Sequence, residues 1–357
     1  MFFKRMVQGK KREYFWKKFP LFFVKEEIYF EYTEDKIEKN KKYLFSIENY
    51  DETHIKINIF GIKIKIPKKE YNKLKKENPF YKYKSKNYDI TKIPPAKGQL
   101  RDIQLANGIL LKELDYVCKK NNISYWLDGG TLLGAIRHGG FIPWDDDIDA
   151  GMLIQDYEKI ISAFEKSSRD KDIYACYVRN DKHPDMYYIK VKHRKCPCLF
   201  VDIFPFYIYG KSLSTKEQLI KTKEIKNIRK NFCNVNFLTP DKTLAKIHKQ
   251  IMLKIISQNI PKNLEETDLV WGVEYNHQWN NWFTNYNVIF PLKPMKFEGQ
   301  EFLGLNNPDA FLKRVYGNYM SYPKRITFGH NAYKKIEKKE LTEIKKLAEK
   351  FVLGREN

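Results

Sequence analysis

The segment FIPWDDDIDAGM at residues 141–152 constrains the fold most, because it sets four aspartates within five positions among apolar residues. Like charges this close repel one another, and each carboxylate is more stable in water than in a core. Their apolar neighbours are residues that favour a core. These neighbours are Phe141, Ile142, Trp144, Ile148 and Met152. The segment can be buried only if something neutralises its carboxylates.

The spacing of the aspartates suggests what neutralises them. If residues 145–149 are extended, Asp145, Asp147 and Asp149 point to one face of the strand and Asp146 to the other. Backbone positions i and i+2 of a strand lie about 7 Å apart, so the carboxylate oxygens can converge on one cation. Hard oxygen ligands suit Mg²⁺ or Mn²⁺. The alternating aspartates therefore predict a site for a divalent cation.

Three other interpretations of the aspartates fit less well. An EF-hand loop requires a glycine at its sixth position and a glutamate at its twelfth, where this chain has Ala150 and Asp156. A solvated acidic turn does not suit a segment with so many apolar residues. A glycosidase pair of carboxylates does not need three acids at alternate positions.

The glycines upstream of the aspartates point to an anion. Gly129, Gly130 and Thr131 follow a predicted strand and open a predicted helix. The first N–H groups of a helix are free to bind an anion. Arg137 lies further along this helix and can hold a phosphate through two hydrogen bonds. The sequence has neither a Walker A lysine here nor a G-x-G-x-x-G motif, so neither nucleotide-binding loop is predicted.

A further carboxylate comes from a later strand. A strand, a glycine turn, a short helix and a strand with alternating aspartates resemble the layout of nucleotidyltransferase-fold sites, which usually take one more acid from a neighbouring strand. The motif VDIFPF offers Asp202 between Val201 and Ile203, where an unpaired charge would be costly. A shared cation removes that cost.

Periodicity and turn residues predict an α+β chain. Helices are expected at 99–120, 131–138, 153–166, 214–259, 308–316 and 338–352, and strands at 123–128, through the aspartate segment, three times between 175 and 209, and on both sides of Gly299. The segment IKINIFGIKIKI alternates apolar residues and lysine around Gly61, which predicts a hairpin. We expect a basic, β-rich N-terminal module at 1–95, a catalytic domain at 96–325 with a helical insertion at about 212–290, and a C-terminal helical tail at 326–357.

The chain is strongly basic, with a net charge of +22. The first 100 residues hold 25 Lys/Arg against 13 Asp/Glu. Such a charge attracts polyanions such as nucleic acid, anionic lipid or a phosphorylated glycan. A general bias towards lysine, asparagine and isoleucine explains the excess equally well. The charge therefore permits an anionic partner without identifying one.

Cysteine usage and the N-terminus bear on localisation. Five cysteines in 357 residues predict a reducing cytoplasm rather than a disulfide framework. No segment reaches the ~18–20 apolar residues of a spanning helix. The N-terminus, MFFKRMVQGKKREYFWKKFPLFFVK, lacks the features of a signal peptide. It mixes basic and aromatic residues, which suits either a membrane interface or packing on the protein itself.

Three blocks of the sequence resemble one known family. WLDGGTLLGAIRHGGFIPWDDDIDAGM (126–152) resembles the signature of the LicD family, which includes the fukutin-related proteins. FVDIFPF (200–206) resembles its downstream motif, and FEGQEFLGLNNPDAFLKRVYGNYMSYP (297–323) resembles its C-terminal block. The resemblance covers residues 98–323. One departure is Tyr207, where the family often has an acid.

The resemblance implies a nucleotidyltransferase-like fold, with a mixed sheet flanked by helices. It also implies a metal-dependent transfer of a phosphate-linked alcohol from a CDP-activated donor to a glycan hydroxyl, with release of CMP. CDP-choline is the expected donor, and capsule, lipopolysaccharide or lipooligosaccharide is the expected setting. The catalytic residues carried over are Asp145, Asp147, Asp149 and Asp202. The expected substrate-binding residues are Gly129, Gly130, Thr131, Arg137, His138 and Trp144.

On this hypothesis, Mg²⁺ or Mn²⁺ binds to Asp147, Asp149 and Asp202, and neutralises the departing CMP. Asp145 or His138 accepts the proton of the attacking hydroxyl. We favour Asp145, because a single histidine next to a glycine is more often a helix-end residue.

The transferred alcohol remains open between two classes. A choline group needs an aromatic cage, whereas a polyol needs hydrogen-bonding partners. The aromatic candidates are Trp144, Trp271, Trp279, Trp282, Tyr286 and Tyr188, although most aromatic residues serve in a core. The candidates for a polyol are Asn280, Asn281 and Asn285.

The basic charge suits a glycan or lipid-linked glycan acceptor, with the protein in the cytoplasm and in peripheral contact with anionic membrane. No specific nucleic acid is expected. One competing hypothesis is a nucleotidyltransferase that moves NMP to an acceptor and releases pyrophosphate. A second is a non-catalytic basic module that binds nucleic acid or membrane.

Overall fold

The computed structural model of this chain divides into two compact units, Met1–Ile90 with Tyr322–Thr327, and Thr91–Ser321 with Phe328–Asn357. Side chains are described for residues 89–181, 183–231, 235–256, 260–275, 279–322 and 336–354, and five strands before residue 89 are described by their backbone. The division lies close to the domain boundary expected near residue 95.

The first unit contains short antiparallel strands. They are β1 (Arg5–Val7), β2 (Lys10–Arg12), β3 (Phe45–Asn49), β4 (His54–Ile59) and β5 (Ile62–Pro67). β1 pairs with β2, and β3, β4 and β5 form a three-stranded sheet. Ile59 pairs with Ile62, so the hairpin predicted around Gly61 is confirmed. The membrane contact expected of the N-terminal side chains lies outside the described residues.

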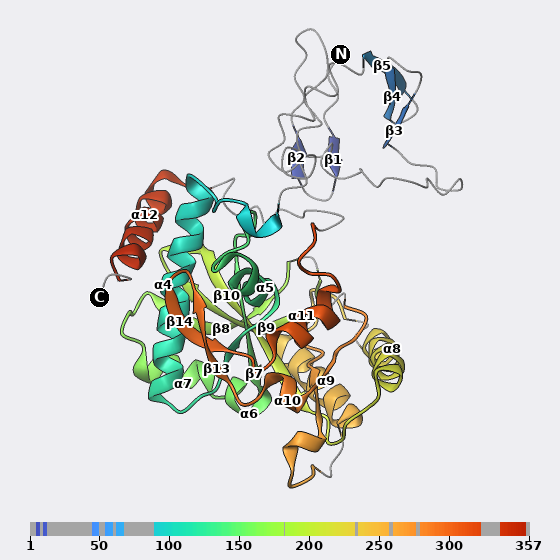
Figure 1. Ribbon diagram of the computed structural model, residues 1–357, viewed down its shortest axis with the longest axis vertical. Coiled ribbons are helices and arrows are strands. Elements are labelled where there is room, and N and C mark those ends of the chain that lie inside the picture. Colours follow the sequence, from blue (N-terminus) through green and yellow to red (C-terminus); the bar gives the residue numbers. More distant parts are fainter. Residues whose placement is uncertain are drawn as a thin grey trace. The chain divides into compact units, whose positions relative to one another are not determined.

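The second unit is built on a mixed sheet of seven strands (Figure 1). Its strands are β6 (Trp126–Leu127), β7 (Ile148–Leu153), β8 (Ile173–Arg179), β9 (Tyr187–His193), β10 (Cys196–Ile208), β11 (Asp268–Trp271) and β12 (Phe283–Asn285). β10 pairs with β7 in parallel, and it pairs antiparallel with β9 and, at its C-terminal end, with β11. This sheet, flanked by helices, confirms the predicted α+β fold.

Alternation along β7 and β10 decides which face each side chain takes. Ile148 and Ala150 on β7, with Val201 and Ile203 on β10, are fully buried in the main hydrophobic core. Because successive strand residues point to opposite faces, the intervening aspartates lie on the other face. The parallel register sets one of these aspartates, on β7, directly beside the one on β10.

Helices flank the sheet (Figure 1). The helices of the second unit are α4 (Gln99–Lys120), α5 (Gly129–His138), α6 (Ile154–Tyr157), α7 (Ile160–Ser167), α8 (Thr215–Phe232), α9 (Asp241–Ile255), α10 (Tyr286–Ile289), α11 (Pro308–Tyr316) and α12 (Lys338–Leu353). The 3-10 helices are η1 (Ile90–Lys92) and η2 (Leu264–Glu266). A hairpin of β13 (Lys293–Phe297) and β14 (Gln300–Gly304) completes the unit.

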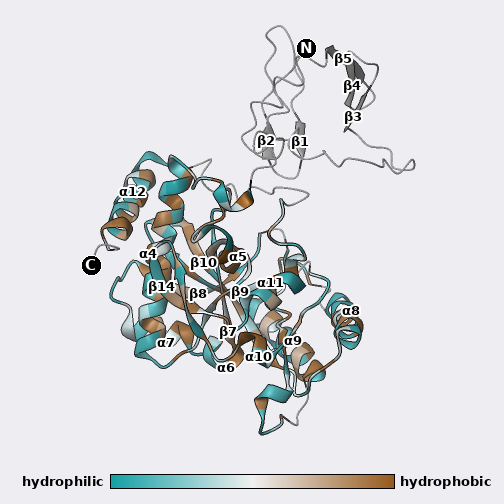
Figure 2. Cartoon of the chain, viewed as in Figure 1, coloured by the Kyte–Doolittle hydropathy of each residue, from teal (hydrophilic) through white to brown (hydrophobic). Residues whose placement is uncertain are grey.

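The C-terminal helix packs against α4. A Cβ added to Gly108 would lie 2.5 Å from the ring of Phe351, so the glycine allows the two helices to approach closely. Phe351 is fully buried. Figure 2 shows hydrophobic residues along the sheet and hydrophilic residues on the outer faces of the helices. No helix in the described part of the chain is long and apolar enough to cross a membrane.

The structure differs from the prediction in three places. The single helix expected at 153–166 is divided into α6 and α7. β7 begins at Ile148, so residues 143–144 form a turn and residues 145–147 a loop before the strand, rather than part of it. The stretch expected as a helical insertion is helical in α8 and α9, but it then supplies β11 and β12 to the central sheet. Strands this short show too little alternation to be recognised, and pairing with β10 determines them.

A buried histidine on α9 makes the fold sensitive to acid. His248 is 1% exposed and its Nε2 lies 3.0 Å from the carbonyl oxygen of Asp185. Burial lowers the pKa of His248 to about 4, whereas it is about 6.5 in the unfolded chain. Below pH 6.5 the unfolded state binds the proton first, so acid favours unfolding.

We expect the free energy of unfolding to fall as the pH is lowered from about 6.5 to about 4, with His248 contributing up to about 3 kcal/mol. His248→Gln should remove this share and flatten the pH dependence, measured by urea unfolding. His183→Gln, at an exposed histidine, should leave the dependence unchanged. Equal pH dependence in His248→Gln and the wild type would show that His248 is not responsible.

Candidate active site

Three carboxylates, two from neighbouring strands and one from the loop before β7, meet on the face of the sheet opposite the main core. Asp149 on β7 and Asp202 on β10 are register neighbours, and Asp147 lies just before β7. One oxygen from each of the three lies within 4.8 Å of the others. The expected convergence of these aspartates is therefore present in the structure.

The preceding loop brings in two more carboxylates. Asp145 and Asp146 each place an oxygen within 4.8 Å of the other and of Asp147. The expectation that Asp146 points to the opposite face is therefore wrong, because the backbone is not extended there. Helix α4 positions this loop: Gln104 Nε2 donates to the carbonyl of Asp145 at 2.7 Å, and Asn107 Nδ2 donates to that of Asp146 at 2.9 Å.

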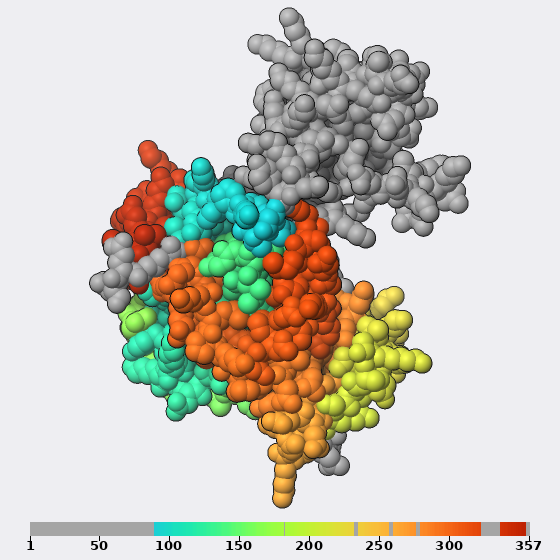
Figure 3. Space-filling model, in the orientation of Figure 1, coloured from blue at the N-terminus to red at the C-terminus, as the bar shows by residue number. Residues whose placement is uncertain are grey.

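The glycines at the start of α5 hold Asp149. The N–H of Gly130 donates to Asp149 Oδ2 at 2.9 Å, and the N–H of Asp149 donates to Thr131 Oγ1 at 2.7 Å. A Cβ added to Gly129 would lie 2.5 Å from Asp149 Oδ2, and its φ is +50°. The anion at this helix N-terminus is thus the protein's own carboxylate. In Figure 3 part of α5 reaches the surface, framed by the start of α4 and by residues 293–322.

We expect Gly129→Ala to lower the transfer rate by at least tenfold, because the new methyl group displaces the carboxylate of Asp149. Gly139→Ala is a matched control, since Gly139 has a φ of +68° and nothing within 4 Å of its Cβ position. Both substitutions carry a backbone strain of about 1–2 kcal/mol, which thermal unfolding measures. If the two variants lost equal activity, contact with Asp149 would not be the cause.

The electrostatics of the cluster favour a bound cation. Burial raises the pKa of Asp149 well above its ordinary value, and the charges of Asp147 and Asp202 raise it further. Burial and Asp147 likewise raise the pKa of Asp145. The ionised form of each acid is unfavourable without a counter-charge. A set of convergent carboxylate oxygens fits Mg²⁺ or Mn²⁺.

Asp128, which precedes the glycines, is a buried acid that sequence reasoning did not single out. It is fully buried, and burial raises its pKa to about 6. Trp271 Nε1 donates to its Oδ2 at 3.4 Å. The buried Trp271 therefore supports the strand end that leads into α5.

Asp202 has a cationic partner that was not predicted. Lys190 Nζ lies 2.8 Å from Asp202 Oδ1, and the hydroxyl of Tyr188 donates to Oδ2 at 3.3 Å. Lys190 is the cross-strand neighbour of Asp202 in the β9–β10 pair. Its ammonium also lies 3.7 Å from the centre of the Phe200 ring. In the sequence, the feature that could have revealed this partner is Lys190 itself, a lysine that follows aromatic and aliphatic residues at the start of β9.

Arg137, His138 and Trp144 form a separate group. Arg137 Nη1 donates to the carbonyl of Tyr319 at 3.0 Å, its Nε donates to His138 Nε2 at 2.9 Å, and its guanidinium lies 5.7 Å from the Trp144 ring. Burial lowers the pKa of Arg137 to about 10. Burial and Arg137 lower that of His138 to about 4. Two of the three guanidinium nitrogens are thus already used, which limits the expected bidentate contact with a phosphate.

The aromatic residues proposed for a choline cage differ in how deeply they are buried. Trp144, Trp271, Trp282 and Tyr188 are less than 10% exposed and pack in the interior. Trp279 is partly exposed, and its ring meets that of Tyr316 edge to face at 5.0 Å. Burial raises the pKa of Tyr316 well above its ordinary value, and the charges of Asp149, Asp128 and Asp145 add to this effect. Tyr316 on α11 therefore lies near the acidic cluster.

Tyr275 is another residue near the acidic cluster that was not predicted from the sequence. Burial and then the charge of Asp202 raise its pKa, and its ring lies 5.0 Å from that of Tyr188. The asparagines proposed for a polyol are mostly structural: Asn281 Nδ2 donates to Gln218, and Asn285 caps α10. Asn280 is exposed.

The sequence matches one known family. Residues 122–240 match the family described as LicD/FKTN/FKRP, nucleotidyltransferase domain. The matched range contains the turn into α5, the aspartate segment and β10. The family resemblance seen in the motifs is therefore confirmed.

Individual relatives differ in how much they share with this chain. Lipopolysaccharide cholinephosphotransferase LicD from Haemophilus influenzae is 28% identical over 257 residues, which cover 64% of this chain and 93% of the relative. Human ribitol 5-phosphate transferase FKRP is 35% identical over 94 residues, 26% of this chain and 18% of the relative. Mouse ribitol-5-phosphate transferase FKTN is 44% identical over 50 residues, 14% of this chain and 11% of the relative. The chain thus spans nearly all of one relative and less than a fifth of the other two.

Proposed function

We propose that this chain, whose residues 122–240 match the LicD/FKTN/FKRP nucleotidyltransferase domain, transfers a phosphate-linked alcohol from a CDP-activated donor to a glycan hydroxyl, with release of CMP. The observation that carries this proposal is the meeting of Asp147, Asp149 and Asp202 between two paired strands inside the matched range. The relatives named above are a cholinephosphotransferase and ribitol-phosphate transferases, so transfer of a phosphate-linked alcohol is common to them.

Asp147, Asp149 and Asp202 are the residues that would hold Mg²⁺ or Mn²⁺. When bound, the cation supplies neutralising charge for the donor diphosphate and the departing CMP. The protein itself keeps these carboxylates in position. Gly130 and Thr131 hold Asp149, and the pairing with β7 and β9 holds Asp202.

We assign to Asp145 the role of accepting the proton of the attacking hydroxyl. Its carboxylate adjoins that of Asp147, and its raised pKa makes it a stronger base than an exposed aspartate. His138 is the alternative, because its lowered pKa leaves it neutral near pH 7 and able to accept a proton. His138 is, however, already hydrogen-bonded to Arg137. Asp145 is therefore the better candidate.

Phosphocholine is the transferred group that we favour. Of the three relatives named above, the one with the longest match is a cholinephosphotransferase. The Trp279–Tyr316 pair offers ring surface beside the acidic cluster, and aromatic rings attract quaternary ammonium groups. The proposed acceptor is a glycan or a lipid-linked glycan of the cell surface.

The test is to incubate the protein with Mg²⁺ and separate CDP-choline, CDP-ethanolamine and CDP-ribitol, together with a glycan acceptor, and to measure released CMP and pyrophosphate. CMP release that depends on Mg²⁺ and is fastest with CDP-choline is the expected result. Pyrophosphate release from a nucleoside triphosphate would instead establish NMP transfer. Salt-sensitive oligonucleotide binding without any turnover or metal dependence would favour a non-catalytic basic module.

A further inference from the structure

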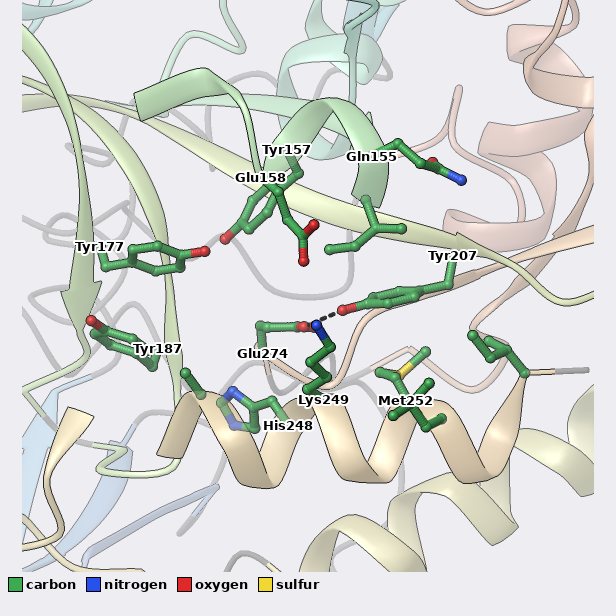
Figure 4. Close-up of a pocket in the computed structure, with 14 residues that line it drawn as sticks. Gln155, Tyr157, Glu158, Tyr177, Tyr187, Tyr207, His248, Lys249, Met252 and Glu274 are labelled. Carbon is green, nitrogen blue, oxygen red and sulfur yellow. Dashed lines mark hydrogen bonds between the residues drawn. The ribbon is translucent and has the colours of Figure 1, made fainter. Parts of the chain in front are cut away.

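A second cavity lies away from the acidic cluster. It has a volume of about 230 Å³ and lies between α6, α9 and the ends of β8, β9 and β10 (Figure 4). Four tyrosines and two glutamates contribute to its wall. They are Tyr157, Tyr177, Tyr187, Tyr207, Glu158 and Glu274.

The cavity opens on the other face of the sheet. Tyr188 on β9 donates a hydrogen bond to Asp202 on β10, so these two side chains share the face of the acidic cluster. Tyr187 is the strand neighbour of Tyr188, and Tyr207 is an odd number of residues from Asp202. Both therefore point to the opposite face. The cavity is thus separate from the candidate active site.

Glu274 is a buried carboxylate with unused hydrogen-bonding capacity. It is 7% exposed, and the hydroxyl of Tyr207 donates to its Oε1 at 2.5 Å. Its Oε2 is buried and has no hydrogen-bond partner among the described residues. The nearby Arg229 donates to the carbonyl groups of Val273 and Asp185 instead. A buried carboxylate oxygen without a partner is costly unless a ligand satisfies it.

The tyrosines add ring surface around this carboxylate. The rings of Tyr177 and Tyr187 stack at 4.9 Å with an interplanar angle of 18°, and Tyr157 meets Tyr177 edge to face at 6.3 Å. In Figure 4 the carboxyl groups of Glu158 and Glu274 both point into the space that these rings border. Aromatic rings and carboxylates together recognise an ammonium ion, because both present negative potential to it.

We propose that this cavity binds a small alkylammonium group. Its volume of about 230 Å³ is below the ~300–1,000 Å³ of pockets for drug-sized ligands, so it suits an ammonium headgroup rather than a nucleotide or a glycan. A free amine and the headgroup of a phosphate ester share this chemistry, and the test separates them. The inference does not depend on the proposed transfer reaction.

Lys249 is the lysine that lines the cavity, and it discriminates between a cationic and an anionic ligand. It is exposed on α9, and in Figure 4 its ammonium group points into the cavity on the side of Glu274, although no ion pair joins it to either glutamate within the described residues. If the ligand is an ammonium ion, removing this like charge should leave the affinity unchanged or raise it. If the ligand is an anion, Lys249→Met should weaken binding.

The experiment is calorimetric titration of the full chain with tetramethylammonium, phosphocholine and the neutral isostere 3,3-dimethylbutan-1-ol. Tetramethylammonium should bind, and the neutral isostere should bind at least about tenfold more weakly. Tighter binding of phosphocholine than of tetramethylammonium would identify a phosphate ester as the source of the headgroup if Glu274→Gln weakens that binding, because phosphocholine is also the group proposed for the active site.

Glu274→Gln and Tyr187→Leu should each weaken tetramethylammonium binding by about tenfold, and Asp149→Asn, in the acidic cluster, should leave it unchanged. Circular dichroism checks that each variant is folded. If Glu274→Gln fails to fold, Tyr177→Leu takes its place as the test variant, because Tyr177 is 40% exposed and its substitution should disturb the core less. Equal binding of the charged and neutral probes, no binding of tetramethylammonium, or its loss in Asp149→Asn would overturn the proposal.

Discussion

Asp147→Asn is expected to reduce the rate of alcohol-phosphate transfer by about 10²–10³-fold, while the protein stays folded. The substitution removes one charged oxygen from the set that Asp149 and Asp202 complete. Charge neutralisation by a bound cation is worth several kcal/mol in the transition state, and each 1.36 kcal/mol changes the rate tenfold. Release of CMP from the donor under saturating substrate measures the effect.

Although Asp147→Asn should slow transfer, it should not destabilise the metal-free protein. Asp147 raises the pKa of both Asp145 and Asp149 by repulsion, so an uncharged side chain at 147 relieves the metal-free cluster. Thermal unfolding in EDTA should therefore show a melting temperature at least as high as that of the wild type. Added Mg²⁺ should stabilise the wild type more than the variant.

Asp181→Asn is the control for Asp147→Asn, because Asp181 is exposed. It should leave both the transfer rate and the response to Mg²⁺ unchanged. Near-normal turnover in Asp147→Asn would remove the residue from the catalytic set.

Lys190→Met should destabilise the metal-free protein by about 3 kcal/mol. The side chains of Lys190 and Asp202 are 13% and 4% exposed, and their charged atoms lie 2.8 Å apart. Removing one partner of a buried pair leaves the other charge without compensation. Urea unfolding in EDTA measures the loss.

Mg²⁺ should recover much of the stability lost in Lys190→Met, because a cation shared by Asp147, Asp149 and Asp202 takes over neutralisation of the orphaned carboxylate. Lys119→Met is the matched control: Lys119 also lies 2.8 Å from an aspartate, Asp115, but its side chain is 62% exposed. An exposed pair contributes about 0–1 kcal/mol. A similar small loss in both variants would mean that Lys190 does not stabilise Asp202.

The longest helices and the meeting of the carboxylates could be predicted because local patterns determine them. Helix α4 runs from Gln99 to Lys120 as expected, since its apolar spacing ends at an asparagine pair. Asp149 and Asp202 each lie between apolar residues on a strand, so burying the neighbours forces both acids to one face. Their meeting then requires that the two strands are adjacent and pair in the register that sets Asp149 beside Asp202.

The remaining features of the site depend on contacts between distant segments. The loop at Asp145 and Asp146 takes its shape from Gln104 and Asn107 on α4, which no pattern within the loop reveals. Arg137 turns towards the carbonyl of Tyr319, far along the chain. Its expected role as a phosphate ligand therefore stays a prediction.

Lys190 and Tyr316 illustrate the same limit. Lys190 reaches Asp202 only because β9 pairs with β10 in one particular register. Tyr316 approaches the acidic cluster because α11, which begins at Pro308, packs near α5. Register and helix placement are decided by the whole core, so neither residue could be assigned from its own surroundings in the sequence.

Anomalous diffraction from crystals grown with Mn²⁺ would locate the ion among five neighbouring carboxylates. We expect a peak bound by Asp147, Asp149 and Asp202 together, as the proposed metal site requires. A peak held by the Asp145–Asp147 loop without Asp202, or none at this face of the sheet, would contradict it.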